Sequence, residues 1–149
     1  MKPTRIKFRN RIKYRLNGLL HREDGPAIID SIGTFYWYQH GMLHRTDGPA
    51  IVYANGTISW YQNHKLYNTN GPAVITSTGI KEWLQNDFRH REDGPAITYP
   101  DGSEFWYLNG KLHNTKGPAI VYSNGEKYWY IDNEEVNYET YKNKIRRQN

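Results

Sequence analysis

The chain of 149 residues contains no cysteine, which excludes disulfides, thiol nucleophiles and thiolate zinc sites. No stretch approaches the ~18 apolar residues that a membrane-spanning helix needs, and the charged start lacks the apolar core of a signal peptide. Hydrophobic residues make up only 37% and the mean hydropathy is −0.91, which is low for a thick two-layer globule. We therefore expect a soluble, cytoplasmic protein with a thin core.

Aromatic residues are abundant by contrast. They make up 15% of the chain, with 13 tyrosines and 5 tryptophans, so the composition is not that of a disordered protein. Tyrosine and tryptophan combine an apolar body with a polar tip and suit half-buried positions. This composition favours a sheet with two partly solvated faces. The tyrosines fall in columns that could form a stacking platform or could pack across strands.

Three columns of residues recur with a constant step of 23. Gly-Pro dipeptides begin at Gly25, Gly48, Gly71, Gly94 and Gly117. Tryptophans stand at Trp37, Trp60, Trp83, Trp106 and Trp129. A further glycine column holds Gly33, Gly56, Gly79, Gly102 and Gly125. A fixed period of this length is the signature of a repeat architecture.

Each unit contains two runs rich in β-forming residues, separated by turn dipeptides such as Asn109-Gly110 and Asp101-Gly102. No unit has a helical period. We expect an all-β fold, an elongated single-layer antiparallel meander of five to six hairpin repeats with two strands per unit. As a single domain, 1–149, it comprises a basic N-terminal strand (1–13), the repeats (14–136) and a C-terminal helix (137–149).

The tail has the features of a capping helix. Asn137 can serve as its N-cap, and acidic and basic residues lie at the ends that suit the helix dipole. Tyr138, Tyr141 and Ile145 form one apolar stripe. We expect the helix to cover the open end of the sheet, with docking on a partner as the alternative.

The motifs "WYLNGKLHNTKGPAIVYSNGEKY" at 106–128 and "HREDGPAI" at 21–28 and 90–97 carry a resemblance. In its 23-residue step, Trp-Tyr pair, Asn-Gly turn and Gly-Pro-Ala run the chain resembles the MORN-repeat family, in particular the MORN-like variant seen in phage and giant-virus proteins and in some bacterial antitoxins. The resemblance covers about residues 14–136. It implies an elongated single-layer sheet used for interaction, without catalytic residues to carry over.

The His-Arg-Glu-Asp-Gly strings at 21–25 and 90–94 contain residues typical of acid–base or metal sites. With two strands per unit, equivalent histidines would lie roughly 10 Å apart, whereas zinc ligands lie near 2 Å from the ion. In two other units the string is replaced by Asn68-Thr69-Asn70 and Asn114-Thr115-Lys116. We therefore expect a structural turn, no metal, no cofactor and no enzymatic activity.

Positive charge is concentrated at the chain ends. Residues 1–15 hold seven cations and no acid, whereas residues 16–133 hold 9 cations and 12 acids. Cations at every odd position from 5 to 15 would share one face of an extended strand, in a row about 33 Å long, unless a bend at Asn10 splits it. The predicted partner-binding residues are Arg5, Lys7, Arg9, Arg11, Lys13 and Arg15. The alternative is that these charges keep an exposed sheet edge from pairing with another sheet.

Further candidate contacts lie in the irregular units and in the tail. The third and fourth units depart most from the consensus, which indicates either relaxed selection or a partner contact. The secondary candidates are Tyr67, Asp87, Lys142, Lys144, Arg146 and Arg147.

We expect a non-enzymatic binding protein, a phage or viral accessory factor by resemblance, that binds and inhibits a host enzyme or defence component. Its partner would be a host protein or nucleoprotein with an acidic surface. A nonspecific nucleic-acid binder and a self-assembling scaffold are the alternatives. No membrane is implied.

Overall fold

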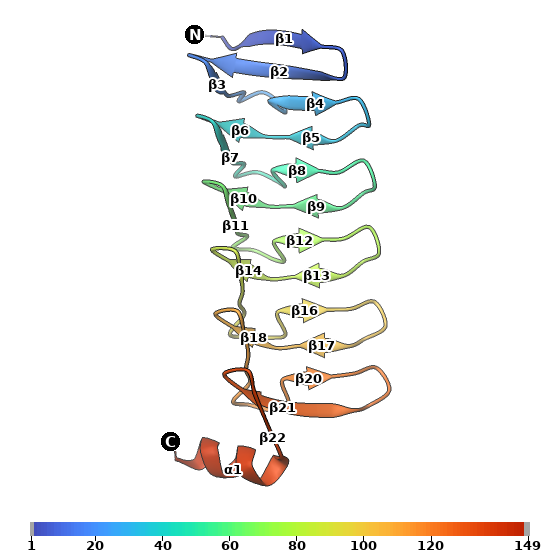
Figure 1. Ribbon diagram of the computed structural model, residues 1–149, viewed down its shortest axis with the longest axis vertical. Helices are drawn as coiled ribbons and strands as arrows, with labels where there is room; N and C mark the ends of the chain where they lie inside the picture. The colour runs from blue at the N-terminus through green and yellow to red at the C-terminus, as the bar shows by residue number, and fades with distance from the viewer. Residues whose placement is uncertain (1, 148–149) are drawn as a thin grey trace.

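Each 23-residue unit forms two hairpins in succession, and the units stack along one axis (Figure 1). The structure is a computed structural model and describes residues 2–147. The second hairpin of each unit joins one continuous antiparallel sheet of 14 strands. The first hairpin is a separate two-stranded piece beside it in four units, whereas Leu19–Leu20 and Glu134–Val136 stay within the long sheet. The predicted all-β meander is confirmed.

The long sheet follows chain order from one edge to the other. Its strands are β1 (Thr4–Phe8), β2 (Arg11–Leu16), β4 (Ile28–Asp30), β5 (Phe35–Tyr36), β8 (Ile51–Val52), β9 (Ile58–Ser59), β12 (Val74–Ile75), β13 (Lys81–Glu82), β16 (Ile97–Thr98), β17 (Glu104–Phe105), β20 (Ile120–Val121), β21 (Lys127–Ile131) and β22 (Glu134–Val136), with β3 (Leu19–Leu20) attached to β2.

Four small hairpins lie along one side of this sheet. They pair β6 (Tyr38–Gln39) with β7 (Met42–Leu43), β10 (Tyr61–Gln62) with β11 (Lys65–Leu66), β14 (Leu84–Gln85) with β15 (Phe88–Arg89), and β18 (Tyr107–Leu108) with β19 (Lys111–Leu112).

The prediction of two strands per unit is wrong, because each small hairpin adds two short strands to the two that lie in the long sheet. The boundary between the long sheet and the small hairpin lies at the tryptophan of each unit. The Trp37 N–H donates to the Ala50 carbonyl of the long sheet at 2.8 Å, while the Trp37 carbonyl accepts the His44 N–H at 3.1 Å and closes the small hairpin. Strand propensity does not reveal this division, because the β-forming run continues through the tryptophan.

The thin core is a column of fully buried alanines. The alanine of each Gly-Pro-Ala run has no exposed surface: Ala27, Ala50, Ala73, Ala96 and Ala119.

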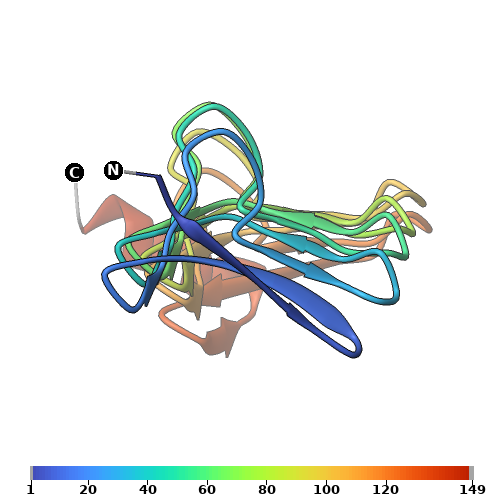
Figure 2. The same cartoon turned by 90° about the horizontal axis from the view of Figure 1, so that it is seen from above.

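Viewed along the long axis, the units superpose, with the long-sheet hairpins extending to one side (Figure 2). The two faces of the sheet differ. We call the side of Tyr14 and Trp37 the loop face, and the side of Tyr36 and Tyr53 the tyrosine face.

Helix α1 (Tyr138–Arg146) closes the C-terminal end, as predicted. The Asn137 side chain accepts the Thr140 N–H at 2.8 Å and caps its first turn. Tyr141, 7% exposed, packs with Ile131 and Val136 in a small apolar cluster. In residues 2–147 no helix is long and apolar enough to cross a bilayer.

Candidate binding surfaces

The predicted basic strand folds as a hairpin. β1 and β2 pair antiparallel from Thr4 opposite Arg15 to Phe8 opposite Arg11, with Arg9 and Asn10 in the turn. We call residues 4–16 the basic hairpin. Its turn uses no glycine and no positive φ, so the usual sequence signal of a tight hairpin is missing.

The prediction of one continuous row of six cations is therefore wrong. Arg5 and Lys7 lie opposite Tyr14 and Ile12, on the loop face. The cations of β2 lie opposite Thr4, Ile6 and Phe8, on the tyrosine face: Arg11, Lys13 and Arg15. The turn at Asn10 reverses the chain, so alternate positions before and after it project from opposite faces.

The charges of the basic hairpin are free of carboxylates. In residues 2–147 none of its six cations forms an ion pair, although Arg15 donates to the Gly18 carbonyl and Lys13 lies 5.4 Å from the centre of the Phe8 ring. In contrast, each arginine of residues 16–133 is paired with a carboxylate: Arg22, Arg45, Arg89 and Arg91. Within the residues described, the unneutralised arginines are those at the two ends.

The β2 cations continue the tyrosine face. Lys13 lies opposite Ile28, which in turn lies opposite Tyr36. Further along this face, aromatic rings contact each other across strands, with centroid distances of 5.2, 5.6 and 5.9 Å along the series Tyr99, Phe105, Tyr122 and Tyr128. These rings pack across strands within the sheet, which is one of the two roles that the sequence suggested for the tyrosine columns. Tyr122 keeps 38% of its surface exposed.

Several phenols on this side stay neutral at physiological pH. Burial raises the pKa of Tyr36, of Tyr38 and of Tyr61 above the ordinary tyrosine value. A hydrogen bond from the Tyr130 hydroxyl to Glu135 raises the pKa of Tyr130. The tyrosine face therefore offers hydroxyl donors and aromatic edges, with positive charge at its N-terminal end.

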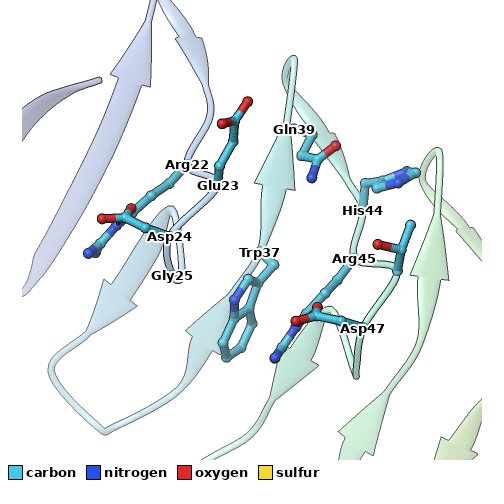
Figure 3. Close-up of a pocket in the computed structure, with 10 residues that line it drawn as sticks. Arg22, Glu23, Asp24, Gly25, Trp37, Gln39, His44, Arg45 and Asp47 are labelled. Atoms are coloured by element: carbon cyan, nitrogen blue, oxygen red, sulfur yellow. Dashed lines mark hydrogen bonds and ion pairs between the residues drawn. The ribbon is translucent and has the colours of Figure 1, made fainter. Parts of the chain in front are cut away.

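The His-Arg-Glu-Asp-Gly string forms the loop between the two hairpins. In the second unit, Arg45 donates to Asp47 at 2.8 Å and to the Pro49 carbonyl at 3.3 Å. Its guanidinium carbon lies 4.3 Å from the Trp37 ring centre. Figure 3 shows Trp37 between this loop and the preceding one. The groove between the two loops has a volume of about 720 Å³. Both of its arginines are already paired with an aspartate of their own loop.

Two copies of the loop have asparagine in place of the arginine, and they keep the hydrogen bond to the proline carbonyl. Asn68 donates to the Pro72 carbonyl and Asn114 to the Pro118 carbonyl, both at 2.9 Å. Each asparagine oxygen also accepts a backbone N–H two residues on. The short amide thus replaces the guanidinium as the group that holds the loop closed. This role explains the Arg-to-Asn variation along the repeat.

The histidine column links neighbouring units. Each Nδ1 accepts a backbone N–H from the turn of the next unit at 3.1 to 3.3 Å, in the pairs His21 with His40, His44 with Asn63, His90 with Asn109 and His113 with Asp132. In two of these pairs Nδ1 also lies beside the asparagine Oδ1, at 3.1 Å for His44 with Asn63 and at 2.9 Å for His90 with Asn109. Within residues 2–147 no three histidine, aspartate or glutamate side chains are grouped so that they could hold a metal ion.

The irregular turn residues make a contact that the sequence did not indicate. Asp87 has φ 71° at a position where other units use glycine, and its carboxylate accepts the Leu66 N–H of the preceding unit at 2.8 Å. His64 and Asn133 accept from Leu43 and Leu112 in the same way. The divergence at Asp87 therefore has a structural reason. A part for Asp87 or Tyr67 in binding remains a prediction.

The tail cations lie apart from the basic hairpin, at the opposite end of the molecule (Figure 1). Lys142 pairs with Glu139 at 2.7 Å and Lys144 with Glu134 at 2.5 Å. Arg146 and Arg147 are exposed at the end of α1. The structure thus does not bring the secondary candidates together with the basic hairpin.

No family model matches this chain, and a search of curated proteins finds no match.

Proposed function

We propose that this chain is a non-enzymatic binding protein that engages one partner protein with an acidic surface through its basic hairpin. The observation that carries the proposal is the contrast in pairing. The six cations of the basic hairpin lack carboxylate partners within residues 2–147, whereas the arginines of the repeats are neutralised. Unpaired charge in one place steers association with an oppositely charged surface.

The internal use of the polar groups supports a binding role. A general base or a nucleophile needs a free lone pair within reach of a substrate. In the repeats, the histidine Nδ1 atoms accept backbone N–H groups, and the aspartates of the arginine-bearing loops are paired. The resemblance to MORN-like repeats leads us to propose further that the partner is a host enzyme or defence component, inhibited by a phage or viral accessory factor.

A second candidate, nucleic-acid binding, is favoured by the shape of the basic hairpin. A two-stranded β-ribbon fits the major groove of DNA, and this ribbon carries cations on both of its faces. Such binding would weaken steeply with salt, because phosphate contacts release counterions.

A pull-down of the tagged chain from host-cell lysate, with and without nuclease, separates the two candidates. Recovery of one stoichiometric protein that survives nuclease treatment supports the protein-binding proposal and identifies the target. Recovery of nucleoproteins that disappear with nuclease would contradict it and leave the second candidate. The bound fraction at low and high salt provides the second readout.

A further inference from the structure

The two ends of the sheet are finished differently. At the C-terminal end, helix α1 covers the last strands, and its Tyr141 packs on Ile131 and Val136. At the N-terminal end, β1 pairs only with β2 and is the first strand in the sheet order. Four of its five residues are exposed. β1 is thus an open sheet edge in the described part of the chain.

The backbone groups on this open edge belong to Arg5 and Lys7. The Tyr14 N–H donates to the Ala27 carbonyl at 2.8 Å, and the Tyr14 carbonyl accepts the His21 N–H at 3.1 Å. Both groups of Tyr14 therefore point away from β1. Since Arg5 lies opposite Tyr14, the two form a non-hydrogen-bonded pair, and the N–H and C=O of Arg5 point outward. Alternation along the strand places those of Lys7 on the same edge.

The side chains beside these groups are cationic. Arg5 and Lys7 lie on the same face as each other, opposite Tyr14 and Ile12, and both are exposed. A second copy of β1 added to this edge would bring cations opposite cations, which destabilises a strand pair. An added strand with carboxylates at alternate positions would instead place opposite charges across the pair. The edge therefore excludes a like strand and favours an acidic one.

We propose that β1 accepts an extended acidic segment of a partner protein as an additional strand. The added segment would hydrogen-bond to the N–H and C=O groups of Arg5 and Lys7, and its alternate carboxylates would lie beside their side chains. Main-chain hydrogen bonds supply affinity in this mode, and side-chain pairing supplies selectivity. The inference rests on the proposed function, since it specifies how the basic hairpin binds its protein partner.

Amide hydrogen exchange of the full chain tests the strand addition directly. The probe is a short synthetic peptide that alternates glutamate and valine. From the pairing of β1 with β2, we expect the Ile6 amide of the free protein to be protected and the Arg5 and Lys7 amides to exchange freely. We expect the peptide to slow exchange at Arg5 and Lys7 at least about tenfold. A control peptide with the same side chains but N-methylated alternate backbone nitrogens should leave these amides unprotected.

A matched pair of variants tests the same point from the protein side. K7P and K7T both remove the charge, but only K7P removes the outward N–H, and proline is tolerated on edge strands at such a position. We expect K7P to bind the peptide roughly tenfold more weakly than K7T, as the loss of a ladder hydrogen bond implies. Unchanged protection of the Ile6 amide in K7P would show that β1 still folds.

Equal binding of both peptides without protection of Arg5 and Lys7 would overturn the strand addition. So would protection of these two amides by a DNA duplex and not by the acidic peptide. In the first case, recovery of a nuclease-resistant partner in the pull-down would leave the proposed function standing. Loss of that recovery would mark the failure of the proposed function itself.

Discussion

Arg22, Arg45 and Arg91 each contact three groups of their surroundings. Each guanidinium pairs with the aspartate two residues on, donates to a proline carbonyl four residues on, and lies 4.0 to 4.3 Å from an aromatic ring centre. The glycine after the aspartate is part of the arrangement. A Cβ at Gly94 would lie 2.7 Å from the Arg91 guanidinium carbon, so a side chain there would push the guanidinium out of this position.

At this scale we predict that Arg45→Ala destabilises the protein by about 1 to 2 kcal/mol, because the Pro49 carbonyl loses its donor and the Trp37 ring loses its stacked cation. Arg45→Asn should cost less than half of this, since Asn68 and Asn114 perform the same role in their loops. Urea unfolding of the two variants measures the difference. Equal losses would contradict the assignment of the loop role to this hydrogen bond.

The aspartates of these loops predict a dependence of stability on pH. The hydrogen bond from the neighbouring arginine holds the pKa of Asp24, of Asp47 and of Asp93 below the ordinary value. A lowered folded-state pKa means that the contribution to stability is complete above about pH 4 and is lost as the pH falls through the folded-state value.

We therefore expect the urea midpoint of the wild-type chain to fall below about pH 4 more steeply than that of a variant with Asn at 24, 47 and 93. The difference between the two curves isolates the three loop carboxylates, because all other acids are shared. Parallel curves between about pH 5 and pH 2 would show that these pairs contribute nothing.

The small hairpins show how local structure and unit-to-unit contact are coupled. Their two-residue turns have positive φ at both central positions, as type I′ turns require. Glycine accepts this geometry without strain, but it has no side chain to reach the preceding unit. Asp87 accepts some backbone strain, and its hydrogen bond to the Leu66 N–H offsets it.

We predict that Asp87→Ala lowers the free energy of unfolding by about 2 kcal/mol, because it removes the hydrogen bond and leaves a Cβ at φ 71°. Asp87→Asn keeps an acceptor and tolerates this φ, so its cost should stay within about 0.5 kcal/mol. Thermal unfolding of both variants checks the pair. If Asp87→Ala leaves stability intact but weakens partner binding, Asp87 is a contact residue as the sequence alone suggested.

The elements that sequence reasoning predicted well are those with a repeated signal. The 23-residue step predicted the meander, and Asn137 with Tyr141 and Ile145 predicted the capping helix. The turn at Arg9 and Asn10 was foreseen only as the alternative to a continuous strand, because the sequence there lacks the glycine that marks a tight hairpin turn. The acceptor role of Asp87 was also missed, because a bond to a residue 21 positions away leaves no local pattern.

On the scale of the whole molecule, each unit is joined to the next by columns of hydrogen bonds in addition to the sheet. The histidine column is one. Hydroxyls at the far turns form another, in which Thr34 accepts the Ala54 N–H at 3.3 Å and Ser103 accepts the Ser123 N–H at 3.0 Å. Such arrays derive stability from neighbour contacts, so the end units depend on their caps.

We expect Tyr141→Ala to destabilise the C-terminal units by about 3 kcal/mol, because it empties a buried site beneath α1. Tyr138→Ala in the same helix is the control. Tyr138 is 51% exposed, so its loss should cost less than about 1 kcal/mol. Hydrogen exchange should show early opening of β20–β22 in Tyr141→Ala, with β4–β9 protected as before. Uniform loss of protection along the chain would contradict a local role for the cap.

We propose that the basic hairpin, and not positive charge in general, recognises the partner. Lys81 and Lys127 provide a matched control, since they are exposed and lie on the same face as Lys7. The decisive measurement is the dissociation constant of the captured partner for two double variants, R5E/K7E and K81E/K127E. We predict that R5E/K7E weakens binding at least about tenfold and that K81E/K127E leaves it nearly unchanged. Equal weakening by both would contradict the claim.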